Sequence, residues 1–446
     1  MVGILGSQVA NAEPIGEDAP PRSTPAELTA ADVEGGPPPG QESGQVDAPR
    51  ESTARMVGRG VLWLPKLAVT GTLAPIRAGV WAYERYHLEA RAIRLFFNDD
   101  ETYGIYPVAD VESELGVTAG ARFVHRDLFG ARERLGLHAA FGGRYRELAS
   151  AKLRSGDRFG SRLTLELTGE YERRPHDPFY GVGDDGSDVA VTRFREQLLR
   201  ATALADARLS GPLHLRMSGA IADFDLGPSD EGPPIEQLHP DVMSSGDVRQ
   251  TYLELELRWD SRRAANRWQP AAIRSTGWLL SGFTGRAIGL DDSNDFTRYG
   301  VDLQRFISLG RRPRVLSARL YGEGVTGDVD QLSFSQLPRL GGKILLRGYP
   351  LDRFRDRVAV VGSLEYAWDL NRFLTASTFV DAGRVAPAID RLDIDDLRVG
   401  YGVAIQAHSE RSFLIRASLA SSLDGGVFAA ISFDPVFDLD PRVERR

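Results

Sequence analysis

Two glycine-containing motifs that lie far apart in the sequence contain an arginine and a carboxylate, residue types that can form an ion pair. Residues 340–350 read Leu-Gly-Gly-Lys-Ile-Leu-Leu-Arg-Gly-Tyr-Pro, so Arg347 lies in a glycine-rich, apolar stretch. Residues 379–383 read Phe-Val-Asp-Ala-Gly, with Asp381 at the centre. A guanidinium can bond a carboxylate with two parallel hydrogen bonds, and burying either charge alone is costly. Such a pair would hold a long loop in one geometry, and a glycine at Gly383 would let a segment approach closely.

Residue patterns typical of enzymes are absent from the sequence. There is no G-x-S-x-G, H-E-x-x-H or Walker motif, and there is no cysteine nucleophile. The histidines His125, His138 and His214 occur singly, which is more typical of solvated or hydrogen-bonded side chains than of catalytic ones. The acidic clusters at 184–188 and 393–396 lack the ligand count of a calcium site. We therefore expect no enzymatic activity, no cofactor and no metal.

Composition narrows the class of protein. The net charge is −8 and basic residues are interleaved with acidic ones, which argues against binding to nucleic acid. Apolar residues make up 42% of the chain, yet none of their runs approaches the roughly 18 residues of a membrane-spanning helix. The chain has no cysteine, as in many barrels that rely on strand pairing alone. A soluble β-rich protein and a membrane β-barrel both remain possible.

A period of two dominates after about residue 102. In 163–168 and 253–260, leucines alternate with charged or hydroxyl residues, which predicts strands with one apolar and one polar face. That alternation fits a soluble sandwich and a membrane barrel equally. The wide spacing of the strands favours the barrel, because about 16 strands over residues 99–434 leave roughly 21 residues for each strand with its connection. We predict an all-β membrane protein, a single 16-stranded antiparallel transmembrane β-barrel. Further strands are expected at 201–209, 315–323, 358–368, 412–419 and 426–433.

The remaining parts of the chain are expected to lie outside the barrel. Residues 1–12 end in Ala-Asn-Ala, which is typical of the remnant of a signal peptide. Residues 13–54 are rich in Pro, Gly, Ser and acidic residues and predict a disordered linker. Residues 55–98 predict a periplasmic helical segment, either lying at the membrane surface or packed on one rim. Residues 435–446 form a charged C-terminal tail.

The motifs at 340–350 and 379–383 resemble those of the BamA/TamA superfamily of bacterial outer-membrane assembly factors. In that family an Arg-Gly-Tyr tip of the sixth extracellular loop folds into the lumen, and an F-x-D-x-G segment on a late strand receives it. Two weaker resemblances extend over the barrel portion, an F-Y-G-x-G turn at 179–183 and a D-x-R segment at 260–262. The alternative is an ordinary hairpin with an exposed arginine. The site residues implied by the resemblance are Arg347, Gly348, Tyr349, Phe379, Asp381 and Gly383, supported by Gly341, Gly342, Tyr180, Gly181, Gly183, Asp260 and Arg262.

The resemblance implies insertion or translocation of protein, or of lipid, at the outer membrane of a Gram-negative bacterium. Implied partners are outer-membrane lipid and client polypeptides, and we expect a monomeric barrel. No segment fits the POTRA domains of the family, so their platform for docking client polypeptides is expected either to be absent or to be supplied by periplasmic partners. A charged tail also follows the last expected strand, where the family commonly ends on an aromatic residue. The alternative function is an outer-membrane pore or solute transporter with a charged lumen.

Overall fold

The computed structural model describes the part of the chain that contains the predicted barrel. The described residues are 94–113, 115–184, 191–233, 235–240, 242, 247–263, 276–290, 295–309, 314–327, 332–370, 374–408 and 413–432. The predicted signal-peptide remnant, linker and charged tail, and most of the predicted 55–98 helical segment, lie outside them. Among the described residues, no helix is both long and apolar enough to cross a membrane.

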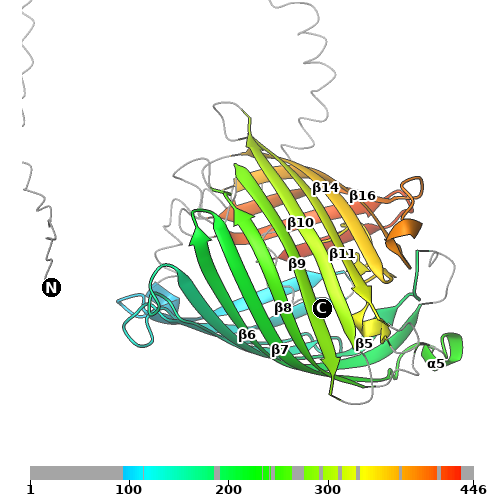
Figure 1. Cartoon of the computed structure of the whole chain (residues 1–446), viewed down its shortest axis with the longest axis horizontal. Coiled ribbons are helices and arrows are strands. Elements are labelled where there is room, and N and C mark those ends of the chain that lie inside the picture. The colour runs from blue at the N-terminus through cyan, green and yellow to red at the C-terminus, as the bar shows by residue number, and fades with distance from the viewer. Residues whose placement is uncertain are drawn as a thin grey trace, which may run out of the picture. The chain divides into compact units, whose positions relative to one another are not determined.

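Sixteen antiparallel strands close into a single barrel, as predicted (Figure 1). Each strand pairs with its neighbour in the sequence, except that β11 pairs with β14 and β1 closes on β18. The strands are β1 (Tyr103–Glu112), β2 (Gly116–His125), β3 (Arg134–Phe141), β4 (Glu147–Arg154), β5 (Leu163–Phe179), β6 (Thr192–Ser210), β7 (Leu213–Pro228), β8 (Val248–Asp260), β9 (Gly277–Gly289), β10 (Phe296–Ser308), β11 (Arg314–Thr326), β14 (Val358–Asp369), β15 (Leu374–Ala386), β16 (Arg398–His408), β17 (Phe413–Ser422) and β18 (Val427–Ser432).

The two faces of the barrel wall differ sharply in polarity. On β8, the side chains of Leu253, Leu255 and Leu257 are about half exposed, whereas Glu254 and Glu256 between them are 6% and 3% exposed. Since a closed barrel has one interior, the carboxylates face the lumen and the leucines face outward. An apolar outer surface around a charged interior is the pattern of a barrel in a lipid bilayer.

The seam between the first and last strands is the shortest strand pairing of the barrel among the described residues. β1 and β18 are in register only at Val111 with Ile431 and at Glu112 with Ala430. Beside these pairs, the Ser113 hydroxyl donates to the Ala429 carbonyl and accepts from the Ala429 amide, both at 3.0 Å. The barrel is therefore closed here by few bonds.

One long loop folds into the barrel between β11 and β14. We call residues 332–357 the inner loop; it contains η3 (Phe334–Gln336), β12 (Arg339–Leu340) and β13 (Phe354–Arg355). Phe334 packs in a buried cluster with Phe179 and Phe194 of β5 and β6, and α5 (Ile235–Leu238) joins this cluster through Ile235. This buried cluster fixes the inner loop against the wall. We call the end of the barrel that holds this loop the loop end, and the other the turn end. A further short helix, η4 (Ile389–Arg391), follows β15.

Candidate functional site at the tip of the inner loop

Arg347, at the tip of the inner loop, is bonded to the barrel wall inside the lumen. Its Nε and Nη2 atoms donate to the two carboxylate oxygens of Asp381 on β15, each at 2.7 Å. The backbone amide of Arg347 also donates to the same carboxylate, at 2.9 Å. Both side chains are almost completely buried, at 2% and 0% exposure. The structure thus brings together the arginine and aspartate singled out in the sequence, as a forked pair with an additional backbone bond.

A second carboxylate and a second arginine complete the cluster. Nη1 of Arg347 donates to Glu365 of β14 at 2.7 Å, and Glu365 accepts two further bonds from Arg416 of β17, each at 2.9 Å. The guanidinium of Arg347 also lies 3.6 Å from the centre of the Phe379 ring. Burial lowers the pKa of Arg347, but Asp381 and Glu365 outweigh that effect, so its pKa lies above the usual value. Two cations face two carboxylates, and no net charge is buried.

Glycines let the backbone of the loop tip touch the wall. Gly348 has a φ of 100°, and a Cβ atom there would lie 2.3 Å from the carbonyl oxygen of Ser421. A Cβ atom at Gly400 on β16 would lie 1.7 Å from the carbonyl oxygen of Arg347. Gly383 instead faces the backbone of Val360 on the neighbouring strand β14. The room for the loop is thus provided by Gly400, which the sequence reading missed, and not by Gly383.

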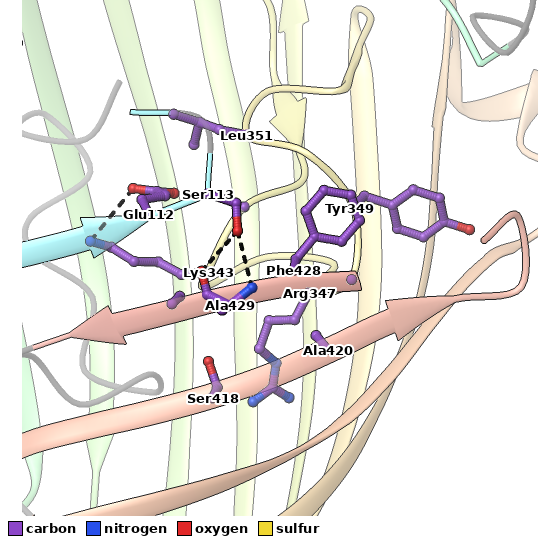
Figure 2. A pocket seen from close by; sticks show the side chains of 13 residues that line it. Glu112, Ser113, Lys343, Arg347, Tyr349, Leu351, Ser418, Ala420, Phe428 and Ala429 are labelled. Carbon is purple, nitrogen blue, oxygen red and sulfur yellow. Dashed lines mark hydrogen bonds and ion pairs between the residues drawn. The ribbon is translucent and has the colours of Figure 1, made fainter. Parts of the chain in front are cut away.

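The tip also reaches both sides of the seam. Figure 2 shows Lys343 of the inner loop beside Glu112 of β1. The Tyr349 hydroxyl donates to Asp424, in the turn between β17 and β18, at 2.9 Å, and burial followed by this contact raises its pKa to about 12. Lys343 lies 2.7 Å from Asp110 and 3.7 Å from Glu112, both on β1. A pocket between tip and seam is lined by residues of the inner loop, β1, β17 and β18. The inner loop therefore contacts the first strand of the barrel, β1, and the turn that precedes its last strand, β18.

The F-Y-G-x-G turn at the end of β5 contacts residues 353–355 of the inner loop. The amide of Gly183 donates to the carbonyl of Arg355 at 2.8 Å, and the guanidinium of Arg353 lies 4.7 Å from the ring of Tyr180. Gly181 and Gly183 both have positive φ angles, which suit glycine. The F-Y-G-x-G turn is therefore in direct contact with the inner loop that carries Arg347.

Arg355 is buried without a hydrogen bond. Its side chain lies 5.0 Å and 5.4 Å from the rings of Phe179 and Phe334, and its three guanidinium nitrogens have no hydrogen-bond partner. Burial, and then the nearby charge of Arg339, lower its pKa to about 10. Stacking on two rings compensates only part of the cost of burying this charge.

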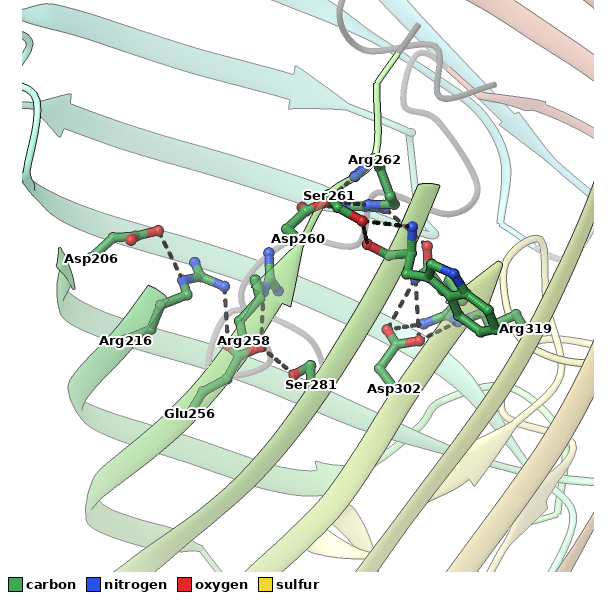
Figure 3. Close-up of polar contacts among 12 residues, drawn as sticks. Asp206, Arg216, Glu256, Arg258, Asp260, Ser261, Arg262, Ser281, Asp302 and Arg319 are labelled. Atoms are coloured by element: carbon green, nitrogen blue, oxygen red, sulfur yellow. Dashed lines mark hydrogen bonds and ion pairs between the residues drawn. The ribbon is translucent and has the colours of Figure 1, made fainter. Parts of the chain in front are cut away.

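The D-x-R segment lies away from the loop tip, at the turn end of β8. Arg262 donates to Asp260 at 2.8 Å and to Gln304 of β10 at 2.9 Å. Figure 3 shows this group beside the Asp302–Arg319 pair and a second chain of ion pairs that runs through Arg216 and Glu256. The segment is therefore part of the charged lumenal wall and does not contact Arg347.

The supporting glycines of the loop motif shape the inner loop itself. Gly341 and Gly342 have φ angles of 121° and 87°, and a Cβ atom at Gly341 would lie 2.0 Å from the carbonyl oxygen of Pro350. They allow the loop to double back behind its tip. Within the described residues, no group of His, Asp or Glu side chains could hold a metal ion.

Solved structures with the same architecture exist at low sequence identity. BamA from Haemophilus ducreyi lacking POTRA domains 1–3 matches over 74% of this chain and 70% of its own, with 14% identity and a TM-score of 0.55. This chain has the BamA-type barrel fold. CdiB from Escherichia coli matches over 73% of this chain and 62% of its own, with 10% identity and a TM-score of 0.50, so the chain spans less than two thirds of that protein. No family profile and no curated protein sequence match the chain.

Three residues of the tip cluster in this BamA-type barrel were not anticipated: Glu365, Arg416 and Gly400. Each lies in a segment with strand-like alternation, and alternation could have placed Glu365 and Arg416 on the lumenal face. It could not have shown that both reach Arg347, because β14 and β17 become neighbours of the loop only when the barrel closes.

Proposed function

We propose that this chain is an outer-membrane barrel of a Gram-negative bacterium that inserts or translocates polypeptide, or lipid, at that membrane. The fold it shares with BamA supports the proposal. The observation that carries it is the position of the Arg347 tip, bonded inside the lumen beside a seam that has two residue pairs among the described residues. A loop that contacts both sides of the shortest described strand pairing is placed to control whether that pairing opens.

The cost of opening follows from the hydrogen bonds at the seam. Unpaired backbone groups in lipid cost several kcal/mol each, so a strand edge there cannot stay free. With two register pairs and the Ser113 contacts, β1 and β18 lose fewer bonds on separation than β5 and β6, which are in register from Leu163 to Phe179 apart from one irregularity. An incoming client strand would satisfy the exposed groups by adding to the free edge.

The proposed function involves three kinds of partner and no enzymatic reaction. Lipid would contact the apolar outer surface, client polypeptides would enter at the seam, and periplasmic proteins would deliver them. The barrel would act as a monomer, without a cofactor, an enzymatic step or binding to nucleic acid.

A disulfide across the seam tests the proposal, because the natural chain has no cysteine. We would combine Val111→Cys with Ile431→Cys, which are directly opposed, reconstitute the barrel in liposomes and measure insertion of a small barrel client by protease protection. Oxidation should stop insertion and reduction should restore it. The control combines Leu303→Cys with Leu320→Cys, an opposed pair within the β10–β11 wall, where a disulfide should have no effect. Equal insertion with the seam oxidised would refute the proposal.

The alternative of a solute pore is favoured by the charged lumenal wall of Figure 3. Single-channel conductance separates the two functions. A pore should show large, stable conductance steps in the natural chain. A barrel filled by its inner loop should be nearly silent and become noisy after Arg347→Ala.

A further inference from the structure

Several arginines of the lumenal wall are paired with carboxylates, whereas a group near the turn end is not. Arg200 lies 2.7 Å from Glu170, and Arg319 lies 2.8 Å from Asp302. Four other arginines, which we call the mouth arginines, have side chains without an ion pair or hydrogen bond among the described residues. They are Arg122, Arg134, Arg162 and Arg208.

Strand alternation places the mouth arginines on the lumenal face. Arg208 has the same phase on β6 as Arg200 and Thr202, which are 6% and 5% exposed. Arg162 directly precedes β5 and has the phase of Thr168, 7% exposed. Arg134 and Arg122 have the phase of His138 and Thr118 on β3 and β2. The side chains thus border the lumen at its mouth and do not face the bilayer.

The mouth arginines lie on neighbouring strands. The amide of Arg208 donates to the carbonyl of Arg162 at 2.7 Å, and the strands from β2 to β6 are consecutive in the barrel. The strand registers place Arg122 level with Arg200, eight residues before Arg208. Four strand spacings of about 4.8 Å, combined with that offset at about 3.3 Å per residue, give a span of roughly 33 Å. The nearest lumenal carboxylates on β5 and β6 have partners of their own, Glu166 with Lys152 at 3.4 Å and Asp206 with His214 at 2.7 Å. A local excess of positive charge therefore exists in a chain of net charge −8.

We propose that the mouth arginines bind an acidic polypeptide segment, in extended conformation, at the turn end of the lumen. This inference rests on the proposed function, because it describes how a client or its carrier is first held. At about 3.3 Å per residue, about ten extended residues would cover the span of the four arginines.

Other anionic ligands fit this surface less well. Phospholipid head groups would meet the outward positions of the same strands, where Leu137 and Leu167 are 42% and 56% exposed. A small inorganic anion would reach one or two of the arginines, and exposed single contacts of this kind are weak. An extended acidic chain can contact all four at once, so that its binding is multivalent.

The test measures binding of a fluorescein-labelled peptide of ten glutamates to the full barrel in detergent, by fluorescence anisotropy. The variant Arg134→Gln/Arg162→Gln/Arg208→Gln should raise the Kd roughly tenfold, because each exposed charge contact contributes a factor of about two to three. The matched control Arg144→Gln/Arg249→Gln/Arg286→Gln removes three exposed arginines at the loop end and should leave the Kd unchanged. High salt should abolish the difference.

Equal effects of the two variants, or no effect of the mouth variant, would overturn the inference. So would a result in which the mouth variant loses binding to phosphatidylglycerol liposomes but keeps binding to the peptide, since lipid would then be the ligand. Insertion of an uncharged client is measured alongside. If the client inserts but the mouth variant does not weaken peptide binding, the proposed function stands and this inference is wrong. If the mouth variant weakens peptide binding as expected but no client inserts, the proposed function is wrong.

Discussion

Arg347 and Asp381 should behave as a single energetic unit. Arg347→Ala leaves the completely buried Asp381 carboxylate without a cation, whereas Glu365 keeps Arg416. Asp381→Ala leaves Arg347 with Glu365 alone. Removing one partner of a buried pair costs about 3–5 kcal/mol, mostly because the other charge stays buried. We therefore expect each single variant to lower the free energy of unfolding by about that amount, and the double variant to be little worse, with a coupling of about 2–4 kcal/mol.

Two measurements test this expectation. Denaturant unfolding in liposomes gives the four free energies of the cycle, and heat-modifiable gel mobility gives an independent ranking. A bis-maleimide link between Lys343→Cys and Asp110→Cys reports whether the loop is still in place. The control is Arg319→Ala with Asp302→Ala, a forked pair of similar burial in the β10–β11 wall, which should lower stability but preserve the link. Additive losses for Arg347 and Asp381 would refute the reasoning.

Three further expectations follow from the contacts. Arg355→Met should leave the free energy of unfolding unchanged or raise it by about 0–2 kcal/mol, because it removes a buried charge without a hydrogen bond; a loss above about 3 kcal/mol in denaturant unfolding would contradict this. Gly400→Ala should abolish the bis-maleimide link, because its Cβ atom would overlap the Arg347 carbonyl. For Glu133, desolvation raises the pKa, but hydrogen bonds from Ala131, Arg158 and Phe129 together lower it to about 2, below its ordinary 4.5. The turn therefore binds more protons when it is unfolded than when it is folded. Hydrogen exchange should show the folded turn at its full stability above about pH 4.5 and progressively less stable towards pH 2. Glu133→Gln should remove this dependence.

The sequence was sufficient for the architecture because alternation is a local signal. Leu253, Leu255 and Leu257 all face outward in the structure, as the alternation predicts, and the predicted count of strands is confirmed. The pairing of Arg347 with Asp381 could be anticipated because both lie in distinctive motifs. Gly400 and Arg416 have no such motif, and they reach the tip only through the closure of the barrel.

The same limit explains the mouth arginines and the contact of Gly183 with Arg355. Arg162 and Arg208 are separated by the whole of β5 and most of β6, and Arg208 follows Asp206 by only two residues in the sequence. Their clustering is a property of the strand register. Burial of Arg355 between two rings likewise depends on the path of the inner loop, which no local pattern encodes.

Hydrogen exchange of the peptide 344–349 in the liposome-reconstituted barrel tests the central claim most directly. If Arg347 is bonded to Asp381 through its amide as well as its side chain, the Arg347 amide in this peptide should exchange as slowly as the amides of strands β14 and β15. Asp381→Ala should abolish that protection. Exchange within seconds in the natural chain would show that the tip is free, and would contradict the account.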